Sequence, residues 1–246
     1  MISIKQFQDT ILVNAAVRDF ADSIGYCQYK IPLSIQGVKG KPSKATIGGA
    51  KAHLEEEIFE QEHVELEPVT TVQIQDSKED IEFAREYVFS MMRSQFNFPS
   101  HKVQVSLFGR IDKIMRSDNT LIVRDDKFTN NPNSYDLMPQ PYPSQMLQVM
   151  TYLNSQFSFE KFSGPNDWFD LPHQKKRWEI RICSIKTREP HRVYSQFVDA
   201  TSQNFLQDSL KIFASIAARA SQPVHHNSKS RCDACDLKDQ CEFRIR

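Results

Sequence analysis

The sequence predicts a mixed α/β fold, with a cluster of strands between helical segments. Apolar residues recur at helical spacing near both ends of the chain and alternate in a period of two at its centre. The 246 residues are 39% hydrophobic and 25% charged, a composition ordinary for a protein with a buried core. Because no repeat or long linker divides the chain, we expect one domain with a helical N-terminal segment (1–48), a core (49–222) and a tail (223–246).

The N-terminal part of the chain is predicted to be helical, with one loop. Residues 5–24 mix apolar and polar positions at helical spacing, which predicts a helix. Residues 36–49 contain four glycines and a proline, so we expect a loop there. A second helix should begin at Ala50. It carries an acidic run, 54–67, with seven Glu and no Lys or Arg, which we interpret as a solvated face.

The centre of the chain changes from helical to strand periodicity. Residues 76–96 are predicted to form another helix, with its N-cap at 76–77. Residues 103–108 then alternate in the period-two pattern of a strand. A turn at 117–119 and a new strand that begins at 121–123 complete a predicted hairpin.

The remaining elements follow in order. Residues 129–144 are rich in Pro and Asn and predict an irregular loop, and residues 144–157 predict a helix. Two more strands are expected at 178–185 and 192–198, and a closing helix at 201–220.

Charge and hydropathy exclude two classes of protein. Lys and Arg together number 31, as do Asp and Glu, so a net charge of zero excludes a nucleic-acid binder that works by bulk charge alone. No apolar run approaches the ~18 residues of a membrane span, and the N-terminus lacks the layout of a secretory signal. We therefore expect a soluble, cytoplasmic protein. Residues 173–192 hold seven Lys or Arg against two Glu, which indicates either a strand pair that tracks phosphates or a solvated edge.

The predicted hairpin carries charged residues typical of a metal site. Residues i and i+2 of a strand share a face, so Asp125 and Lys127 project together, and the partner strand would bring Asp112 beside them. Two carboxylates at the ends of neighbouring strands suit Mg²⁺ or Mn²⁺. A lysine nearby can orient a water or offset charge on a phosphate. The alternative is a surface hairpin with solvated charges.

Two helical segments add further candidates. His53 follows Gly49 in a Gly-x-x-x-His pattern, and Gln145, Gln148 and Tyr152 share one face of a predicted helix. Polar side chains among apolar neighbours indicate a helix face that contacts something other than the core. The alternatives are a structural histidine and a partly buried amphipathic helix.

In chain order these motifs read Gly-x-x-x-His, Gly-x-Ile-Asp, Asp-x-Lys and Gln-x-x-x-Tyr, and together they resemble the RecB-like branch of the PD-(D/E)XK nuclease superfamily. The resemblance implies a restriction-endonuclease-like core, a mixed central sheet flanked by helices. The Mg²⁺ or Mn²⁺ ligands it implies are His53, Asp112, Asp125 and the backbone carbonyl of Asp126. The catalytic residues it implies are Lys127, Asp112 and Asp125, and those that contact DNA or support the lysine are Gln145, Gln148 and Tyr152.

One position departs from the family pattern. The middle residue of Asp-x-Lys is usually apolar, and here it is Asp126. If Asp126 replaced Asp125 as the ligand, the faces of the strand would invert. We favour Asp125 because only that carboxylate shares a face with Lys127.

The cysteines predict a second metal site. Five cysteines in a chain without a signal layout do not indicate disulfides. Three of them form a C-x₂-C-x₅-C pattern in the tail: Cys232, Cys235 and Cys241. Cys27 would complete a four-thiolate set for Zn²⁺ or a [4Fe–4S] cluster, whereas His225 or His226 would complete a three-thiolate zinc site. Spacing alone leaves both alternatives open.

One cysteine before the histidine motif and three at the C-terminus resemble the arrangement of iron–sulfur nucleases, and most of all the fourth family of CRISPR-associated proteins. That resemblance implies a [4Fe–4S] cluster held by Cys27, Cys232, Cys235 and Cys241, with 223–246 as the iron–sulfur tail and 49–222 as the nuclease core. The segment 28–30 reads Gln-Tyr-Lys where that family often has Pro-Arg. Cys183 lies in an apolar strand and is interpreted as a core residue.

The same resemblance implies an activity and partners. We expect a Mg²⁺- or Mn²⁺-dependent exonuclease that degrades single-stranded DNA, often 5′ to 3′. In a CRISPR setting it would trim new spacers for the integrase, with no membrane partner. The rival interpretations are a stand-alone RecB-like repair or recombination nuclease and a non-catalytic zinc or iron–sulfur DNA-binding module.

Overall fold

The computed structural model describes residues 1–42, 44–63, 70–73, 80–85, 88–117, 119–159 and 175–245. The strands are β1 (Ser3–Phe7), β2 (Thr10–Ala16), β3 (Thr70–Gln73), β4 (Asp80–Arg85), β5 (Val88–Phe98), β6 (His101–Arg110), β7 (Lys113–Ser117), β8 (Thr120–Thr129), β9 (Gln156–Phe159), β10 (Lys175–Ser184) and β11 (Pro190–Phe197). The helices are α1 (Val17–Gly25), α2 (Lys30–Ile35), α3 (Lys44–His63), α4 (Pro143–Leu153), α5 (Ala200–Ala217) and α6 (Lys229–Ala234), with a short 3₁₀ helix η1 (Pro132–Tyr135).

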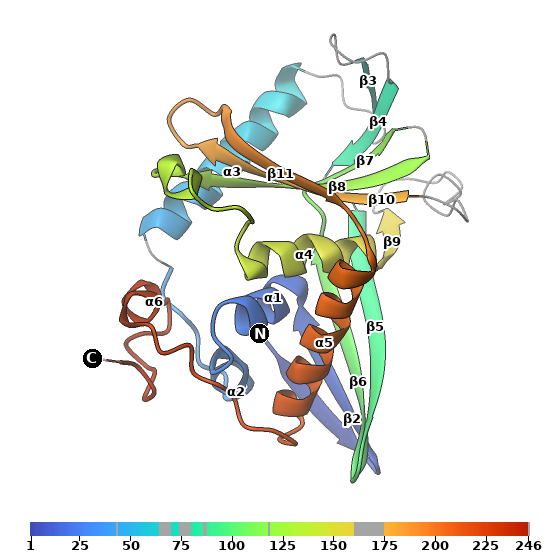
Figure 1. Cartoon of the computed structure of the whole chain (residues 1–246), viewed down its shortest axis with the longest axis vertical. Helices are drawn as coiled ribbons and strands as arrows, with labels where there is room; N and C mark the ends of the chain where they lie inside the picture. Colours follow the sequence, from blue (N-terminus) through green and yellow to red (C-terminus); the bar gives the residue numbers. More distant parts are fainter. Residues whose placement is uncertain are drawn as a thin grey trace.

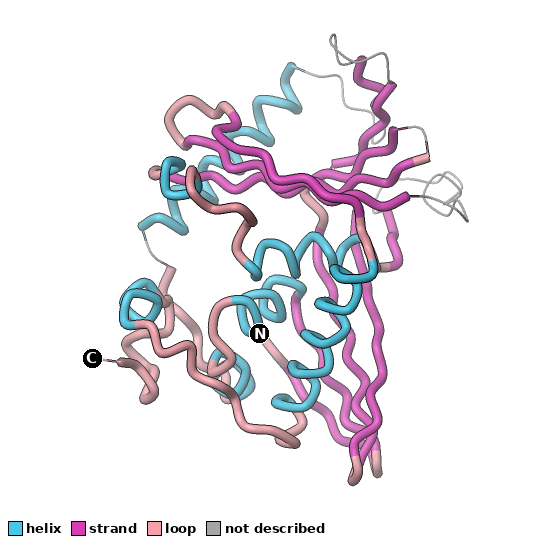
Figure 2. Tube along the Cα trace, viewed as in Figure 1, coloured by secondary structure: helices cyan, strands magenta, loops and turns pink. Residues whose placement is uncertain are grey.

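The strands form two mixed sheets that run in different directions (Figures 1 and 2). The first sheet has the order β1-β2-β6-β5-β9 and the second the order β11-β10-β8-β7-β4-β3. Each sheet contains one parallel pair, β2 with β6 and β8 with β10, among antiparallel neighbours. The mixed α/β architecture predicted from the sequence is confirmed.

Three helices, α1, α4 and α5, lie in the angle between the two sheets (Figure 1). Phe20 of α1 and Phe213 of α5 are fully buried and pack edge to face with ring centroids 5.3 Å apart. Leu147 and Met150 bury the apolar side of α4 in the same core. Burial of each such side chain stabilises the fold by about 1.5–3 kcal/mol, so α4 has a fixed position. Within the described residues, no helix has the length and apolar character to cross a membrane.

The chain passes from the first sheet to the second between β6 and β7. Only Ile111, which is buried, and Asp112 lie between the two strands. β7 then pairs with β8 as an antiparallel hairpin, in which Ser117 faces Thr120. The predicted hairpin is confirmed for its second strand only, because the strand predicted at 103–108 lies in the first sheet and β7 takes its place beside β8. This crossing places Asp112 at the junction of the two sheets.

The helix predicted at 5–24 is wrong for its first part. The segment forms β1 and β2 before α1 begins at Val17, so the N-terminal segment is not wholly helical. Apolar residues occupy both faces of β2: Ile11, Val13 and Ala15 lie on one face, and Leu12 and Ala16 lie on the other. A short apolar run of this kind has no period by which to separate a strand from a helix.

The helix predicted at 76–96 is also wrong. Residues 80–85 and 88–98 form β4 and β5, and the predicted N-cap at 76–77 lies outside the described residues. In β5, buried Ser90 and Met92 alternate with exposed Met91, in the period of a strand. Pairing with β6 along the strand overrides the helical propensity of Met, Arg and Gln.

The other predicted elements are confirmed with shifted ends. The strand at 103–108 lies in β6, the later strands are β10 and β11, and the closing helix is α5. The helix predicted from Ala50 begins at Lys44, so Gly48 and Gly49 belong to α3 and not to the preceding loop. The helix predicted at 144–157 ends at Leu153.

The second sheet carries a buried ion network on the face opposite α4. Asp126 accepts from Lys113, at 3.0 Å, and from Arg181, at 3.1 Å, and its side chain is 3% exposed. Next to this network, Glu179 of β10 pairs with Arg124 of β8 at 2.7 Å. Basic residues of β10 therefore stabilise the sheet. Within the part of the basic segment 173–192 that the structure describes, no residue lines the cleft that is presented in the next section.

We predict that Asp126→Ala lowers the free energy of unfolding by about 3 kcal/mol, because the substitution leaves two partly buried cations without their carboxylate. Urea denaturation of the purified protein measures the change. Asp208→Ala, at an exposed position of α5, is the matched control and should stay within about 0.5 kcal/mol of the parent. Equal stability of the two variants would contradict a structural role for the Asp126 carboxylate.

Candidate active site

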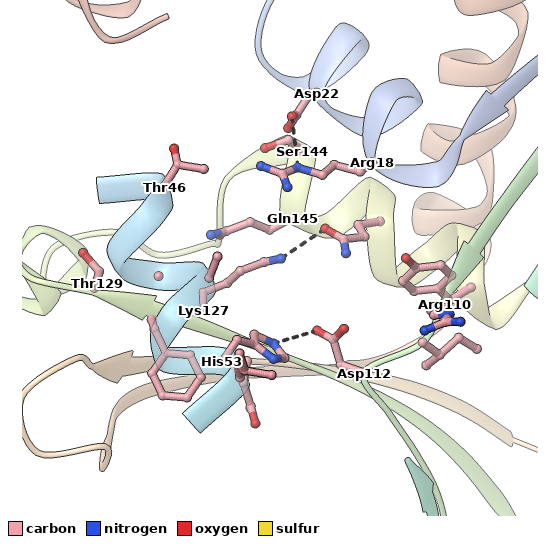
Figure 3. Close-up of a pocket in the computed structure, with 18 of the residues that line it drawn as sticks. Arg18, Asp22, Thr46, His53, Arg110, Asp112, Lys127, Thr129, Ser144 and Gln145 are labelled. Atoms are coloured by element: carbon pink, nitrogen blue, oxygen red, sulfur yellow. Dashed lines mark hydrogen bonds and ion pairs between the residues drawn. The ribbon is translucent and has the colours of Figure 1, made fainter. Parts of the chain in front are cut away.

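A cleft of about 760 Å³ opens between α1, α3, α4 and the second sheet, beside the crossing from β6 to β7 (Figure 3). Most of the site residues predicted from the sequence line it: His53, Asp112, Asp126, Lys127, Gln145, Gln148 and Tyr152. Asp125 lies beneath Lys127 and is almost completely buried, with 2% of its side chain exposed. Residues more than a hundred positions apart in the chain therefore meet in one place.

The side chain of Lys127 is held between a carboxylate and an amide. Its Nζ lies 2.6 Å from Asp125 Oδ2 and donates to Gln148 Oε1 at 3.1 Å. Alternation along β8 puts Asp125 and Lys127 on the face toward α4, whereas the Asp126 carboxylate pairs on the opposite face. The expected pairing of Asp125 with Lys127 on one face is present in the structure.

His53 approaches the same place from α3. Its Nε2 lies 3.3 Å from Asp112 Oδ2, and its ring packs edge-on against Phe128 of β8 (Figure 3). A Cβ at Gly49 would lie 3.3 Å from the backbone oxygen of Phe128, so the absent side chain lets α3 lie close to β8. The glycine of the Gly-x-x-x-His pattern thus positions the histidine.

The two carboxyls of the site influence each other's ionisation. Burial raises the pKa of Asp125, and Asp112 raises it further, although Lys127 opposes this. Burial would raise the pKa of Asp112 as well, but hydrogen bonds with His53 and Asp125 outweigh burial and lower it. The ionised form is therefore favoured more strongly at Asp112 than at Asp125. A divalent cation could stabilise both carboxylates, because a buried pair of carboxyls beside an imidazole is a hard donor set.

Lys127 keeps its positive charge in this setting. Burial alone would lower its pKa, but Asp125 and Asp112 raise it by more, so the net shift is upward. The hydrogen bond with Asp112 likewise raises the pKa of His53, against the effect of burial. The ammonium group of Lys127 is thus a fixed cation beside the acidic pair.

The polar face of α4 divides into two parts. Gln148 contacts Lys127, and Tyr152 lies at the inner end, where burial and then the carboxylates raise the pKa of its phenol. A Cβ at Gly109 would lie 3.0 Å from the Tyr152 hydroxyl, so a glycine there makes room for the ring. Gln145 does not reach Lys127. It hydrogen-bonds at 3.2 Å to the hydroxyl of Tyr135, another residue that lines the cleft.

Sequence reasoning missed several residues that line the cleft. Arg18 enters from the first turn of α1 and lies 3.8 Å from Asp22, and Arg110 enters from the end of β6 (Figure 3). Tyr135 and Thr46 also line the cleft. Arg18 stands in no motif with chemistry of its own. Arg110 is the variable residue of the Gly-x-Ile-Asp pattern, two positions before Asp112, and this position was a signal that could have marked it.

A family model described as the PD-(D/E)XK nuclease superfamily matches residues 35–242. The chain belongs to the PD-(D/E)XK nuclease superfamily. Nucleases of this superfamily use divalent metals such as Mg²⁺ or Mn²⁺. Membership therefore supports a nuclease that acts as a hydrolase, with DNA as the suggested substrate.

Solved structures resemble the chain at low sequence identity. The crystal structure of SSO0001 is 15% identical, covers 98% of this chain and 90% of that chain, and has a TM-score of 0.42. LHK-Exo in complex with dAMP is 10% identical over 82% of this chain and 87% of that chain, with a TM-score of 0.39. Another structure of LHK-Exo, an alkaline exonuclease from Laribacter hongkongensis, is 9% identical over 84% and 91%, with a TM-score of 0.37. No curated protein matches the chain in sequence.

The cysteine-bearing tail of this PD-(D/E)XK protein packs against the segment 26–41. Tyr29 stacks on Phe243 with ring centroids 3.9 Å apart, and Lys30 pairs with Asp236 at 3.0 Å. Figure 1 shows α6 and the C-terminus beside the N-terminal helices. The two cysteine-bearing segments of the chain are therefore in contact.

The four cysteines predicted to bind a cluster lie in one neighbourhood. Burial raises the pKa of the Cys27 thiol, and Cys241 and Cys232 raise it further. Burial also raises the pKa of Cys235, with Asp236 and Cys27 adding to the effect. All are free thiols, as is Cys183, which is fully buried in β10.

Two histidines lie beside one of these cysteines. Cys232 Sγ is 3.7 Å from His225 Nε2 and 3.9 Å from His226 Nε2, and within the described residues this is the group whose ligand atoms all lie within 4.8 Å of one another. A single zinc ion needs ligands this close together, whereas a cubane cluster holds its cysteine sulfurs further apart. Within the described residues, the donor set that the structure brings together thus fits a mixed cysteine–histidine zinc site.

We predict that Mn²⁺ raises the melting temperature of the protein, because a cation held by Asp112 and Asp125 binds only the folded site. At a concentration ~100-fold above the dissociation constant, the gain in stability is about 2.7 kcal/mol. Differential scanning calorimetry with and without Mn²⁺ measures it. Asp112→Asn should lose the gain, and the control Asp208→Ala should keep it. If Mn²⁺ raised the melting temperature of Asp112→Asn by the same amount, the ion would bind at a site that does not include Asp112.

Proposed function

We propose that the protein is a Mg²⁺- or Mn²⁺-dependent exonuclease that acts on single-stranded DNA. One observation carries the proposal: the half-buried Lys127 is held between Asp125 and Gln148 in a cleft that also contains the His53–Asp112 pair. The ammonium group of Lys127 lies next to residues that can bind a divalent metal. It can offset the negative charge that develops when a phosphodiester is hydrolysed.

Each residue has a proposed role in this reaction. His53, Asp112, Asp125 and the backbone carbonyl of Asp126 hold the metal, which when bound would lower the pKa of a water and polarise the phosphate. Lys127 orients the attacking water and offsets the charge that builds on the phosphate. Gln148 keeps the ammonium group of Lys127 in place, and Tyr152 supports the inner end of the site.

A strand of DNA fits the charges at the rim of the cleft. Arg18 and Arg110 line it on two sides and supply cations for the phosphates that flank the reacting one. Arginine suits this position because its planar fork can donate two hydrogen bonds to a phosphate. The 5′ to 3′ polarity is part of the proposal and rests on the resemblance of the motifs to RecB-like exonucleases.

We predict that Lys127→Ala lowers the single-turnover rate on single-stranded DNA in Mn²⁺ by about 10²- to 10⁴-fold, because the charge of the transition state loses its cation. Affinity for DNA should change little, since one phosphate contact among many is lost. Asp125→Asn should be as damaging to the rate. The matched control is Lys102→Ala, an exposed lysine of β6, which should cleave at the parental rate. Cleavage by Lys127→Ala at the parental rate would show that the cleft is not the active site.

We further propose that Cys27, Cys232, Cys235 and Cys241 hold a [4Fe–4S] cluster that fastens the tail to the N-terminal segment. The shared neighbourhood of the four thiols supports it, as does the packing of the tail on residues 26–41. Ligand atoms within 4.8 Å favour the rival, a zinc ion on Cys232 with His225 and His226. A cytoplasmic location would keep the thiols reduced and available for either metal.

The metal content of the tail decides between these alternatives. Protein purified without oxygen should be brown and contain about four iron atoms per chain, since thiolate-bound iron absorbs visible light. Cys232→Ala should lose iron and solubility because metal binding contributes to folding, and the control Cys183→Ala should keep the iron. Colourless protein with one zinc per chain would overturn the cluster and favour the histidine site.

The proposed biological role is the trimming of new spacers for the CRISPR integrase. A RecB-like repair nuclease would use the same chemistry, so the genes that neighbour this one separate the two roles. A non-catalytic DNA-binding module would bind single strands in Mn²⁺ without cleaving them, and the rate measurements on Lys127→Ala and its parent identify that case.

A further inference from the structure

The segment 131–142, which joins β8 to α4, forms one side of the cleft and is here named the strap. Side chains of β11 fix its backbone. Arg192 Nη1 donates to the carbonyl of Tyr135 at 2.9 Å, and the hydroxyl of Tyr194 donates to the carbonyl of Met138 at 3.1 Å. A connection without regular structure would otherwise lose entropy when ordered, and these bonds offset that loss. The strap is therefore a fixed wall.

Two tyrosines meet at the cleft end of the strap. The ring of Tyr135 lines the cleft, and the ring of Tyr142 packs against it at 77°, with centroids 5.4 Å apart. Tyr135 is buried, whereas Tyr142 is 42% exposed. The exposed ring is thus supported by a buried one.

Gln145 holds both tyrosines. Its Oε1 accepts from the backbone N–H of Tyr142 at 3.1 Å, and its Nε2 donates to the hydroxyl of Tyr135 at 3.2 Å. The hydrogen bonds of Lys127 go to Asp125 and Gln148, and none joins it to Gln145. The hydrogen bonds of Gln145 go instead to the two tyrosines. Gln145 positions an aromatic pair.

Tyr142 lies beside the cleft, in contact with Tyr135 and Gln145, which line it. Its exposed aromatic ring therefore suits a ligand that has a flat face of its own. The face of an aromatic ring interacts only weakly with water. Every nucleobase, in contrast, has a π-face that can stack on such a ring, and this stacking does not depend on the DNA sequence. Tyr142 immediately precedes α4 and stands six residues before Gln148, which corresponds to about 9 Å along a helix. A DNA strand that reaches the ammonium group of Lys127 can therefore also reach the ring of Tyr142.

We propose that Tyr142, supported by Tyr135 and positioned by Gln145, is a stacking site for one nucleobase of the DNA strand bound in the cleft. The proposal rests on the function proposed above and names the feature that selects single strands. In a duplex both faces of an internal base are covered by its neighbours, so only an unpaired or splayed base can use the ring. The phosphate contacts of Arg18 and Arg110 alone would not discriminate in this way.

Binding of a fluorescein-labelled single-stranded oligonucleotide, measured by anisotropy in EDTA, tests the proposal without cleavage. Tyr142→Ala should weaken binding about tenfold, within the range that alanine substitution of a stacking residue produces. Tyr142→Phe keeps the ring and should bind like the parent. Leu137→Ala is the matched control, since Leu137 lies on the same strap and is 96% exposed but has no π-face. Equal losses in Leu137→Ala and Tyr142→Ala would overturn stacking.

Oligonucleotides with a single abasic position, moved along the strand, provide the second measurement. For the parent, one position should weaken binding as much as Tyr142→Ala does, and the same position should have no further effect in that variant. Independent, additive losses would overturn the proposal. If the parent binds and cleaves single strands but Tyr142→Ala binds them equally well, only the stacking site fails. If the parent binds no DNA, the proposed function itself fails.

Discussion

The cleft is organised around the ion pair between Lys127 and Asp125. Each charge would cost several kcal/mol to bury alone, so both positions are stable only because they face each other and because Gln148 takes a further hydrogen bond from the ammonium group. Three elements must meet for this to happen: β8 supplies the pair, α4 supplies the amide, and the crossing from β6 to β7 supplies Asp112. The packing of α4 between the two sheets is what holds them at contact distance.

Consecutive aspartates on β8 have opposite roles because a strand alternates its faces. Asp125 lies beneath Lys127 and pairs with it, while the Asp126 carboxylate lies on the opposite face and joins Lys113 and Arg181 in a network that stabilises the sheet. A shift of one residue in the pairing of β8 would exchange the two carboxylates and bring the structural one into the cleft. The buried network on the far face therefore also fixes the register on which the site depends.

The sequence predicted which charged residues meet in the cleft better than it predicted the fold around them. Asp125 and Lys127 follow from strand periodicity alone, and the order of the motifs brought in His53 and Asp112. The strands β1, β2, β4 and β5 were missed because their partners, distant in the chain, decide their conformation. Gln145 was placed on the correct helix face, but its contact with Tyr135 was not predicted, since no local pattern predicts the path of the connection that carries Tyr135. Arg18 was missed because it stands in no motif with chemistry of its own.

The tail is linked to the cleft through the start of α3. The backbone N–H of Lys41 donates to the carbonyl of Asp236 at 3.0 Å, and Gln240 donates to the carbonyl of Lys39 at 3.1 Å. These bonds fix the loop 36–42, which precedes the helix that carries His53 toward Asp112. A metal bound by the cysteines of the tail, as proposed above, would add ordering energy to this loop. Such a metal centre would then influence the geometry of the cleft while taking no part in its chemistry.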